Sequence, residues 1–115
     1  MNAHPALGKQ RWFDAGRAAE VPTRGARRIS TPLGDVAIFR TTDGELFALV
    51  DRCPHKGGPL SQGMVVGHAV ACPLHNWQIS LVTGEPLGAD AGHGCAPPIP
   101  IEVREGRVML GLGRR

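Results

Sequence analysis

The segments that decide the fold of this chain are Cys53-Pro54-His55-Lys56-Gly57-Gly58-Pro59-Leu60 and Cys72-Pro73-Leu74-His75-Asn76-Trp77. Each segment offers one thiol and one imidazole at short spacing, as Cys-x-His in the first and Cys-x-x-His in the second. Proline fixes the backbone angle φ and glycine permits angles closed to other residues, so we expect both segments to be loops. The sequence therefore offers four candidate metal ligands: Cys53, His55, Cys72 and His75.

The chain between the two loops is long enough to bring them together. Sixteen residues separate His55 from Cys72. Within them, the apolar runs 64–66 and 69–72 flank Gly67-His68, a pattern that predicts a hairpin. Such a hairpin would place both loops at one end of a sheet.

The remainder of the chain consists of short apolar runs separated by turn residues. Runs 36–41 and 46–51 are rich in β-branched and aromatic residues, and the Asp43-Gly44 pair between them is a strong hairpin signal. Strands at this spacing, without an amphipathic helix among them, predict an all-β fold, a small antiparallel sandwich or barrel. Further strands are predicted at 11–14, 26–30, 78–82, 100–104 and 107–112, with at most one helical turn at 17–20 and a loop at 87–98.

Length and composition indicate a single domain over residues 1–115, with its core at about 11–112. The chain is 42% hydrophobic and 20% charged, which is near the globular average and argues against disorder. Its net charge of +3 is spread out rather than gathered into a basic stripe, so we expect no nucleic-acid partner. No apolar run approaches the roughly 20 residues that span a bilayer, and residues 1–10 lack a secretory signal. We therefore expect a cytoplasmic protein without membrane contact.

The four candidate ligands fit two kinds of metal site. Two thiolates and two imidazoles can bind tetrahedral zinc, although structural zinc sites favour pairs of cysteines at short spacing. The mirrored loops suit a [2Fe–2S] cluster better, since each loop then supplies one thiolate to one iron and one imidazole to the other. The sequence holds no Ser-His-Asp set, phosphate-binding glycine loop or carboxylate pair, so we expect no catalytic residues in this chain.

In this ligand pattern the chain resembles the Rieske [2Fe–2S] proteins, whose Cys-x-His and Cys-x-x-His boxes it matches ligand for ligand. The resemblance implies a Rieske-type antiparallel β-sandwich with a small cluster-binding subdomain made of the two loops. It also implies that Cys53 and Cys72 hold one iron and that His55 and His75 hold the other.

Further stretches resemble the small subunit of assimilatory NAD(P)H-dependent nitrite reductase, over roughly residues 12–112. They are residues 55–63 and 72–77, Thr83-Gly84-Glu85, Gly94-Cys95, and the terminal pattern of Pro100, Val103, Gly106, Arg107 and Val108. This resemblance implies an electron-transfer subunit of that oxidoreductase, which serves nitrate assimilation and whose large FAD and siroheme subunit reduces nitrite to ammonium. The alternative is a Rieske ferredoxin of a ring-hydroxylating dioxygenase system, and a zinc-stabilised interaction module is a third interpretation.

Other side chains of chemical interest are expected to have structural roles or to lie at the surface. Cys95 lies in a glycine-rich segment without a partner thiol, so we expect a small filler residue. His4, His68 and His93 are expected at the surface. Trp77 is expected to pack in the core or against a loop rather than to relay electrons.

Overall fold

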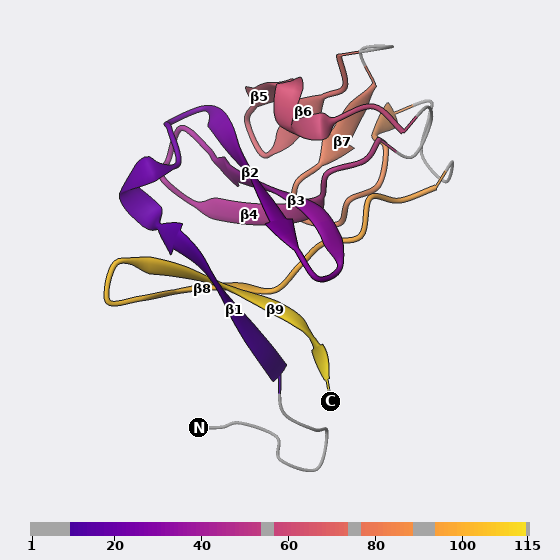
Figure 1. Cartoon of the computed structure of the whole chain (residues 1–115). Helices are drawn as coiled ribbons and strands as arrows, with labels where there is room; N and C mark the ends of the chain where they lie inside the picture. The colour runs from indigo at the N-terminus through magenta and orange to yellow at the C-terminus, as the bar shows by residue number, and fades with distance from the viewer. Residues whose placement is uncertain (1–9, 54–56, 74–76, 89–93, 115) are drawn as a thin grey trace.

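The computed structural model describes residues 10–53, 57–73, 77–88 and 94–114 (Figure 1). Within these ranges the chain forms nine strands and two short 3-10 helices, so the all-β prediction is confirmed. The strands pair antiparallel in three sheets, ordered β1-β9-β8, β2-β3-β4 and β5-β6-β7. The elements are β1 (Gln10–Arg17), η2 (Ala18–Glu20), β2 (Gly25–Thr31), β3 (Gly34–Arg40), β4 (Leu46–Val50), η3 (Leu60–Gln62), β5 (Met64–Val66), β6 (Ala69–Ala71), β7 (Gln78–Ser80), β8 (Ile101–Arg104) and β9 (Arg107–Arg114). No helix in the described ranges is long and apolar enough to cross a membrane.

The hairpin predicted around Asp43-Gly44 is confirmed. β4 pairs with β3 along its whole length. Gly44 takes a φ of +89°, in the left-handed region that favours glycine, and its N–H donates to the carbonyl of Thr41 at 2.9 Å. β2 pairs with the other edge of β3, which makes β3 the middle strand of the central sheet.

β3 is buried on both faces, so the central sheet separates two apolar clusters. Side chains alternate along a strand, and Ala37 and Phe39 join one cluster while Val36 and Ile38 join the other. The loop-side cluster consists of Ala37, Phe39, Leu49, Cys53, Leu60, Val65, Val70, Cys72, Ile79, Leu81 and Ala96. The base cluster consists of Ala15, Val21, Val36, Ile38, Ala48, Ile99, Val108, Leu110 and Leu112.

The ends of the described chain form the sheet that covers the base cluster. β1 pairs with β9, placing Phe13 opposite Leu110, and β8 pairs with β9 through the turn at Glu105-Gly106. The strand predicted at 11–14 is longer than expected, and its register with β9 shifts on both sides of the segment 12–14. Figure 1 shows β1 and β9 crossing below the central sheet, away from the sheet β5-β6-β7.

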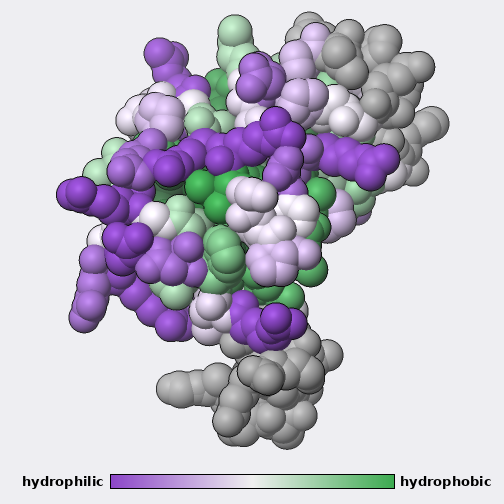
Figure 2. Space-filling view, viewed as in Figure 1, coloured by the Kyte–Doolittle hydropathy of each residue, from purple (hydrophilic) through white to green (hydrophobic). Residues whose placement is uncertain are grey.

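The sheet β5-β6-β7 covers the loop-side cluster through Val65, Val70 and Ile79, which are paired across it. On its first strand, Met64 and Val66 point outward and are 70% and 49% exposed. On the face shown in Figure 2, hydrophilic side chains cover much of the surface and apolar side chains appear between them. The small sheet therefore has one face in the core and one face open to solvent.

The strand predicted at 78–82 ends at Ser80, so its predicted boundary is wrong. The Ser80 hydroxyl accepts the N–H groups of Val82 and Thr83, each at 3.1 Å. The backbone carbonyl of Ser80 accepts the N–H of Gly84 at 2.8 Å. These three bonds bend the chain into a turn immediately after Ser80, because serine competes with the sheet for local backbone N–H groups.

A polar junction joins the central sheet to the sheet β5-β6-β7. His68, on the β5–β6 turn, places Nε2 3.2 Å from Oδ2 of Asp43 and 3.3 Å from Oε1 of Glu45. Its ring packs on Phe47, with centroids 5.6 Å apart. The Thr41 hydroxyl, and after it the His68 ring, lower the pKa of Asp43 from its usual 3.8 to about 2. His68 lies at the surface as predicted, in contact with the other sheet.

The replacement Asp43→Asn is expected to lower stability at neutral pH and to matter less in acid. The pKa of Asp43 in the folded chain lies below its usual value, so the ionised carboxylate stabilises the fold above about pH 4. That contribution is lost as the pH falls toward 2. Urea unfolding of both chains should show a difference in midpoint that is constant at neutral pH and narrows below about pH 4. A difference unchanged between pH 6 and pH 3 would contradict this account.

Candidate metal centre

The first ligand loop begins just after β4. Cys53 follows Val50 by three residues and is 2% exposed. Its N–H donates to the carbonyl of Gly58 at 2.7 Å, and its carbonyl accepts the N–H of Gly57 at 2.8 Å. Gly57 takes a φ of +73°, which favours glycine. These two bonds close the loop between residues 53 and 58.

The second ligand loop is closed in the same way. Cys72 follows the last residue of β6 and is 1% exposed. Its N–H donates to the carbonyl of Trp77 at 2.6 Å, so in both loops the cysteine N–H donates to the carbonyl five residues further along. β7 begins at Gln78, and the second loop therefore connects the middle strand of the small sheet to an edge strand. The two cysteines occupy equivalent positions in two similar loops.

Both thiols belong to one apolar cluster. Cys53 and Cys72 are members of the loop-side cluster together with Leu60, although 18 residues lie between them in the sequence. Trp77 is half-buried and packs against the same cluster, which confirms the packing role predicted for it. The fold therefore brings two sulfur donors from separate loops into one water-poor environment.

This donor set fits a metal centre. Cys53 and Cys72 are thiols rather than halves of a disulfide, and thiolates bind zinc and iron–sulfur clusters. The other two predicted ligands, His55 and His75, lie outside the described residues. The structure thus places the two predicted ligands that would supply sulfur, and both are buried.

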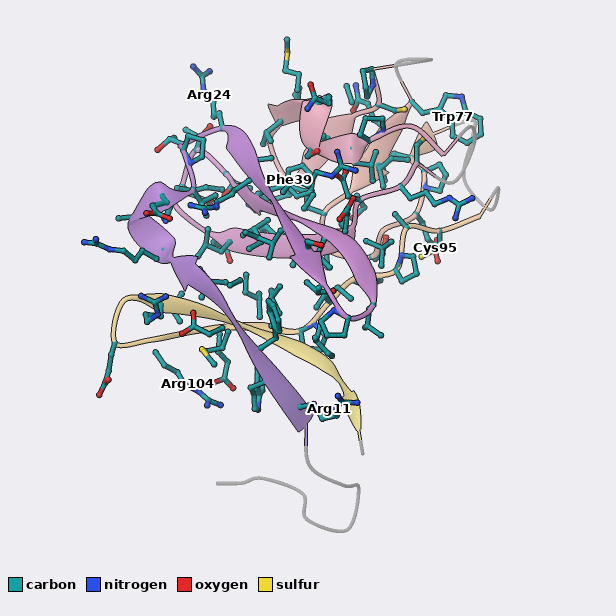
Figure 3. The ribbon with its side chains drawn as sticks, in the orientation of Figure 1. Arg11, Arg24, Phe39, Trp77, Cys95 and Arg104 are labelled. Atoms are coloured by element: carbon teal, nitrogen blue, oxygen red, sulfur yellow. The ribbon has the colours of Figure 1, made fainter. Side chains whose placement is uncertain are left out.

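Cys95 differs from the expectation of a small filler residue. It is exposed, and its Sγ donates to the carbonyl of Thr83 at 3.4 Å. Its side chain therefore links two loops instead of filling a core. Figure 3 shows Cys95 and Trp77 on the same side of the molecule. His4 and His93, both expected at the surface, lie outside the described residues.

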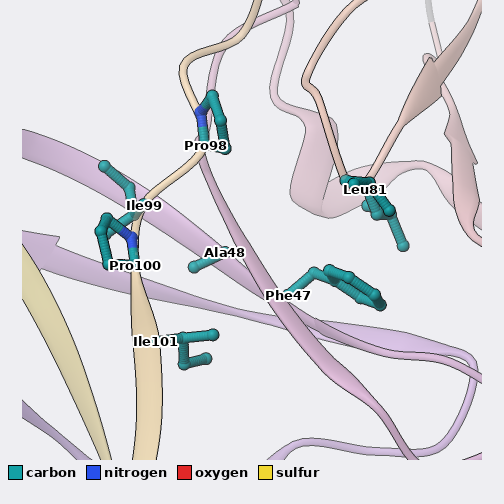
Figure 4. A pocket seen from close by; sticks show the side chains of 8 residues that line it. Phe47, Ala48, Leu81, Pro98, Ile99, Pro100 and Ile101 are labelled. Atoms are coloured by element: carbon teal, nitrogen blue, oxygen red, sulfur yellow. The ribbon is translucent and has the colours of Figure 1, made fainter.

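An apolar pocket of about 310 Å³ lies beside the central sheet, where the chain runs toward β8 (Figure 4). None of its side chains is charged or forms hydrogen bonds, so it offers apolar contact and no group for acid–base or nucleophilic chemistry. Its lining residues are Phe47, Ala48, Leu81, Val82, Pro98, Ile99, Pro100 and Ile101.

One supporting residue of the first loop was not singled out from the sequence. The Asp51 side chain is fully buried, and its carboxylate accepts two hydrogen bonds from Ser61. A charged residue is rarely buried without partners, so an aspartate that directly follows the apolar strand β4 is a signal of such a role. The spacing of cysteine and histidine carries no information about this contact.

The family model of the Rieske [2Fe-2S] domain matches residues 11–97 of this chain. The chain belongs to the Rieske [2Fe–2S] family. The Rieske fold and the Rieske-type cluster predicted from the two loops are thereby confirmed, which favours iron and sulfide over zinc. As a Rieske protein, the chain is an electron carrier of an oxidoreductase system.

Two relatives illustrate where Rieske domains of this kind occur. The Rieske chain is 37% identical over 99 residues to the 3-phenylpropionate/cinnamic acid dioxygenase ferredoxin subunit of Photorhabdus laumondii, covering 79% of this chain and 85% of the relative. It is 39% identical over 99 residues to the 4beta-methylsterol monooxygenase of Methylococcus capsulatus, covering 86% of this chain. The chain spans only 24% of the length of that monooxygenase.

Among solved structures, the Rieske chain is similar to a Mycobacterium tuberculosis protein assigned as a small subunit of NADH-dependent nitrite reductase. The two share a TM-score of 0.83 at 24% sequence identity, covering 93% of this chain and 99% of the other. At this identity the similarity establishes a shared fold over nearly the whole of both chains.

Proposed function

We propose that this Rieske protein is the electron-transfer small subunit of an assimilatory NAD(P)H-dependent nitrite reductase. The observation that carries the proposal is a contact between two segments that resemble that subunit. Ala96, directly after Gly94-Cys95, donates its N–H to the carbonyl of Gly84 at 2.7 Å, and Cys95 donates to Thr83. These contacts join residues twelve positions apart, so the two segments that resemble the nitrite reductase subunit form one structural unit beside the loop-side cluster.

In this function the chain holds a [2Fe–2S] cluster through Cys53, His55, Cys72 and His75. When bound, the cluster supplies reversible one-electron chemistry. Cys53 and Cys72 keep their thiolates in the loop-side cluster, away from water. The bonds that close each loop at Gly58 and Trp77 limit how far either thiolate can move. The large FAD and siroheme subunit would carry out the chemistry on nitrite.

A Rieske ferredoxin of a ring-hydroxylating dioxygenase is the second candidate. It is favoured by the 37% identity to the 3-phenylpropionate/cinnamic acid dioxygenase ferredoxin subunit. Both candidates require the same cluster and the same loops, and they differ in the partner that receives the electron.

A reconstitution experiment separates the two candidates. The cluster-loaded chain is mixed with a siroheme and FAD nitrite reductase large subunit, NAD(P)H and nitrite, and ammonium is measured. In parallel it is mixed with a ferredoxin reductase and a ring-hydroxylating terminal oxygenase, and hydroxylated product is measured. We expect ammonium formation that depends on the chain and fails with the Cys72→Ser variant. Support of hydroxylation without any effect on ammonium formation would contradict the proposal and favour the ferredoxin.

The midpoint potential is expected to lie toward the low end of the Rieske range of about −150 to +300 mV. Hydrogen bonds to sulfur stabilise the reduced cluster and raise its potential. This chain contains no tyrosine, so no tyrosine hydroxyl can donate to sulfur. The N–H groups of Cys53 and Cys72 already donate to backbone carbonyls, so they do not donate to sulfur either. A redox titration followed by absorbance measures the potential, and a midpoint well above zero would contradict the expectation.

A further inference from the structure

The buried carboxylate of Asp51 connects the two ends of the first ligand loop. Its Oδ1 accepts the Ser61 N–H at 2.7 Å, and its Oδ2 accepts the Ser61 hydroxyl at 2.6 Å. Asp51 stands two residues before Cys53, and Ser61 stands three residues after Gly58, where the loop closes. The two residues therefore bracket the segment that carries the first thiol and the first imidazole.

The same carboxylate is anchored to the central sheet. Nε of Arg28, on β2, lies 3.3 Å from Oδ2 of Asp51 and 3.0 Å from Oδ2 of Asp35. The Asp51 N–H donates to the carbonyl of Asp35, on β3, at 2.9 Å. A carboxylate with no exposed side-chain surface is costly unless its oxygens have partners, and here both oxygens do. Asp51 is thus fixed from two directions, by the sheet and by the loop.

Leu60 reinforces the connection from the apolar side. It is fully buried in the loop-side cluster, directly before Ser61, and starts the short helix η3. The end of the first loop is therefore held by a buried apolar contact at Leu60 and by charge-assisted hydrogen bonds at Ser61. Cys53 belongs to the same cluster, so a movement of either loop end would displace its thiol.

We propose that Asp51 is a positioning residue for the [2Fe–2S] cluster. Its carboxylate fixes the first ligand loop so that Cys53 retains its place on iron. The proposal rests on the ligand set named above, and it holds whichever partner receives the electron. Residues that orient metal ligands from outside the coordination shell typically change metal affinity by about 10- to 100-fold when replaced. Without the Asp51–Ser61 contact, binding of the [2Fe–2S] cluster must also order the first ligand loop, so we expect the chain to hold iron less tightly.

The test measures how fast the cluster-loaded chain releases iron to bathophenanthroline. Asp51→Asn is expected to release iron about 10- to 100-fold faster than the wild type. Asp14→Asn is the matched control, because it removes an exposed ion pair with Arg107 on the sheet β1-β9-β8, which lies on the other side of the central sheet from the sheet β5-β6-β7 (Figure 1). This control should release iron at the wild-type rate. The electron paramagnetic resonance spectrum of the reduced cluster should change in Asp51→Asn and stay unchanged in Asp14→Asn.

Ser61 variants test the contact without removing a buried charge. Ser61→Ala loses the hydroxyl donor and keeps the Asp51–Arg28 pair. It therefore tests the positioning role of Asp51 even if Asp51→Asn fails to fold. Ser61→Ala is expected to accelerate iron release, and Ser61→Thr, which keeps a hydroxyl, is expected to restore the wild-type rate. Wild-type release by Ser61→Ala, or equal acceleration by Ser61→Ala and Ser61→Thr, would overturn the proposal.

These measurements are independent of the partner enzyme. A chain whose Asp51→Asn variant loses iron faster, but which does not support ammonium formation, would contradict the nitrite reductase assignment and support the role of Asp51. If the chain supports ammonium formation but Asp51→Asn and Ser61→Ala retain iron as the wild type does, the nitrite reductase assignment is supported and the role of Asp51 is contradicted.

Discussion

Replacing Cys53 or Cys72 with serine is expected to abolish binding of the [2Fe–2S] cluster. Each thiol is buried in the loop-side cluster, and a serine hydroxyl at neutral pH is a far weaker ligand than a thiolate. Either variant should therefore retain less than about a tenth of the wild-type iron and lose the visible absorbance of the cluster. Iron analysis and absorbance spectroscopy of the purified chains measure both effects.

Cys95→Ser is the matched control for this prediction. Cys95 is also a thiol, but it is exposed and lies outside the loop-side cluster. Its serine variant should keep full iron content and an unchanged spectrum. Retention of iron by Cys53→Ser together with its loss from Cys95→Ser would show that the wrong thiols have been assigned as ligands.

The second large effect is expected from Gly84→Ala. Gly84 takes a φ of +78°, and a Cβ added there would overlap the carbonyl oxygen of Ala96. That carbonyl is backbone and is held in place, since the Ala96 N–H donates to Gly84. Left-handed strain and the steric overlap should together lower the free energy of unfolding by about 3 kcal/mol or more. Urea unfolding monitored by tryptophan fluorescence gives the value.

Gly67→Ala separates the strain from the overlap. Gly67 also takes a left-handed φ, +58°, but a Cβ there would meet nothing within 4 Å. Its variant should lose only about 1–2 kcal/mol, the usual cost of a left-handed conformation with a side chain. Equal losses in the two variants would mean that the contact between Gly84 and Ala96 does not matter to stability.

The parts of the fold predicted correctly from sequence depend on local chemistry. The Asp43-Gly44 turn was found because a tight turn requires a positive φ at glycine, and both flanking runs favour strands. The pairing of β1 with β9 joins residues about 100 positions apart, and no local pattern specifies such a partner. The boundary of β7 was missed because Ser80 hydrogen-bonds to its own turn, a competition that hydrophobic patterning does not register.

In the candidate site, too, local sequence patterns predict some residues, and others depend on tertiary contacts. The four candidate metal ligands were predicted because thiols and imidazoles at mirrored spacing are rare outside metal sites. The structure places two of them, Cys53 and Cys72, in the loop-side cluster. Asp51 was missed because its role depends on Ser61, ten residues away, and on Arg28, on another strand. Contacts of this kind are made by tertiary structure and have no signature in ligand spacing.

The most direct test of the central claim is metal and sulfide analysis of the purified chain. A Rieske centre held by Cys53, His55, Cys72 and His75 requires two iron ions and two acid-labile sulfides per chain, and a paramagnetic signal that appears on reduction. We expect those stoichiometries in the wild type. Zinc in place of iron, or iron without labile sulfide, would contradict the account.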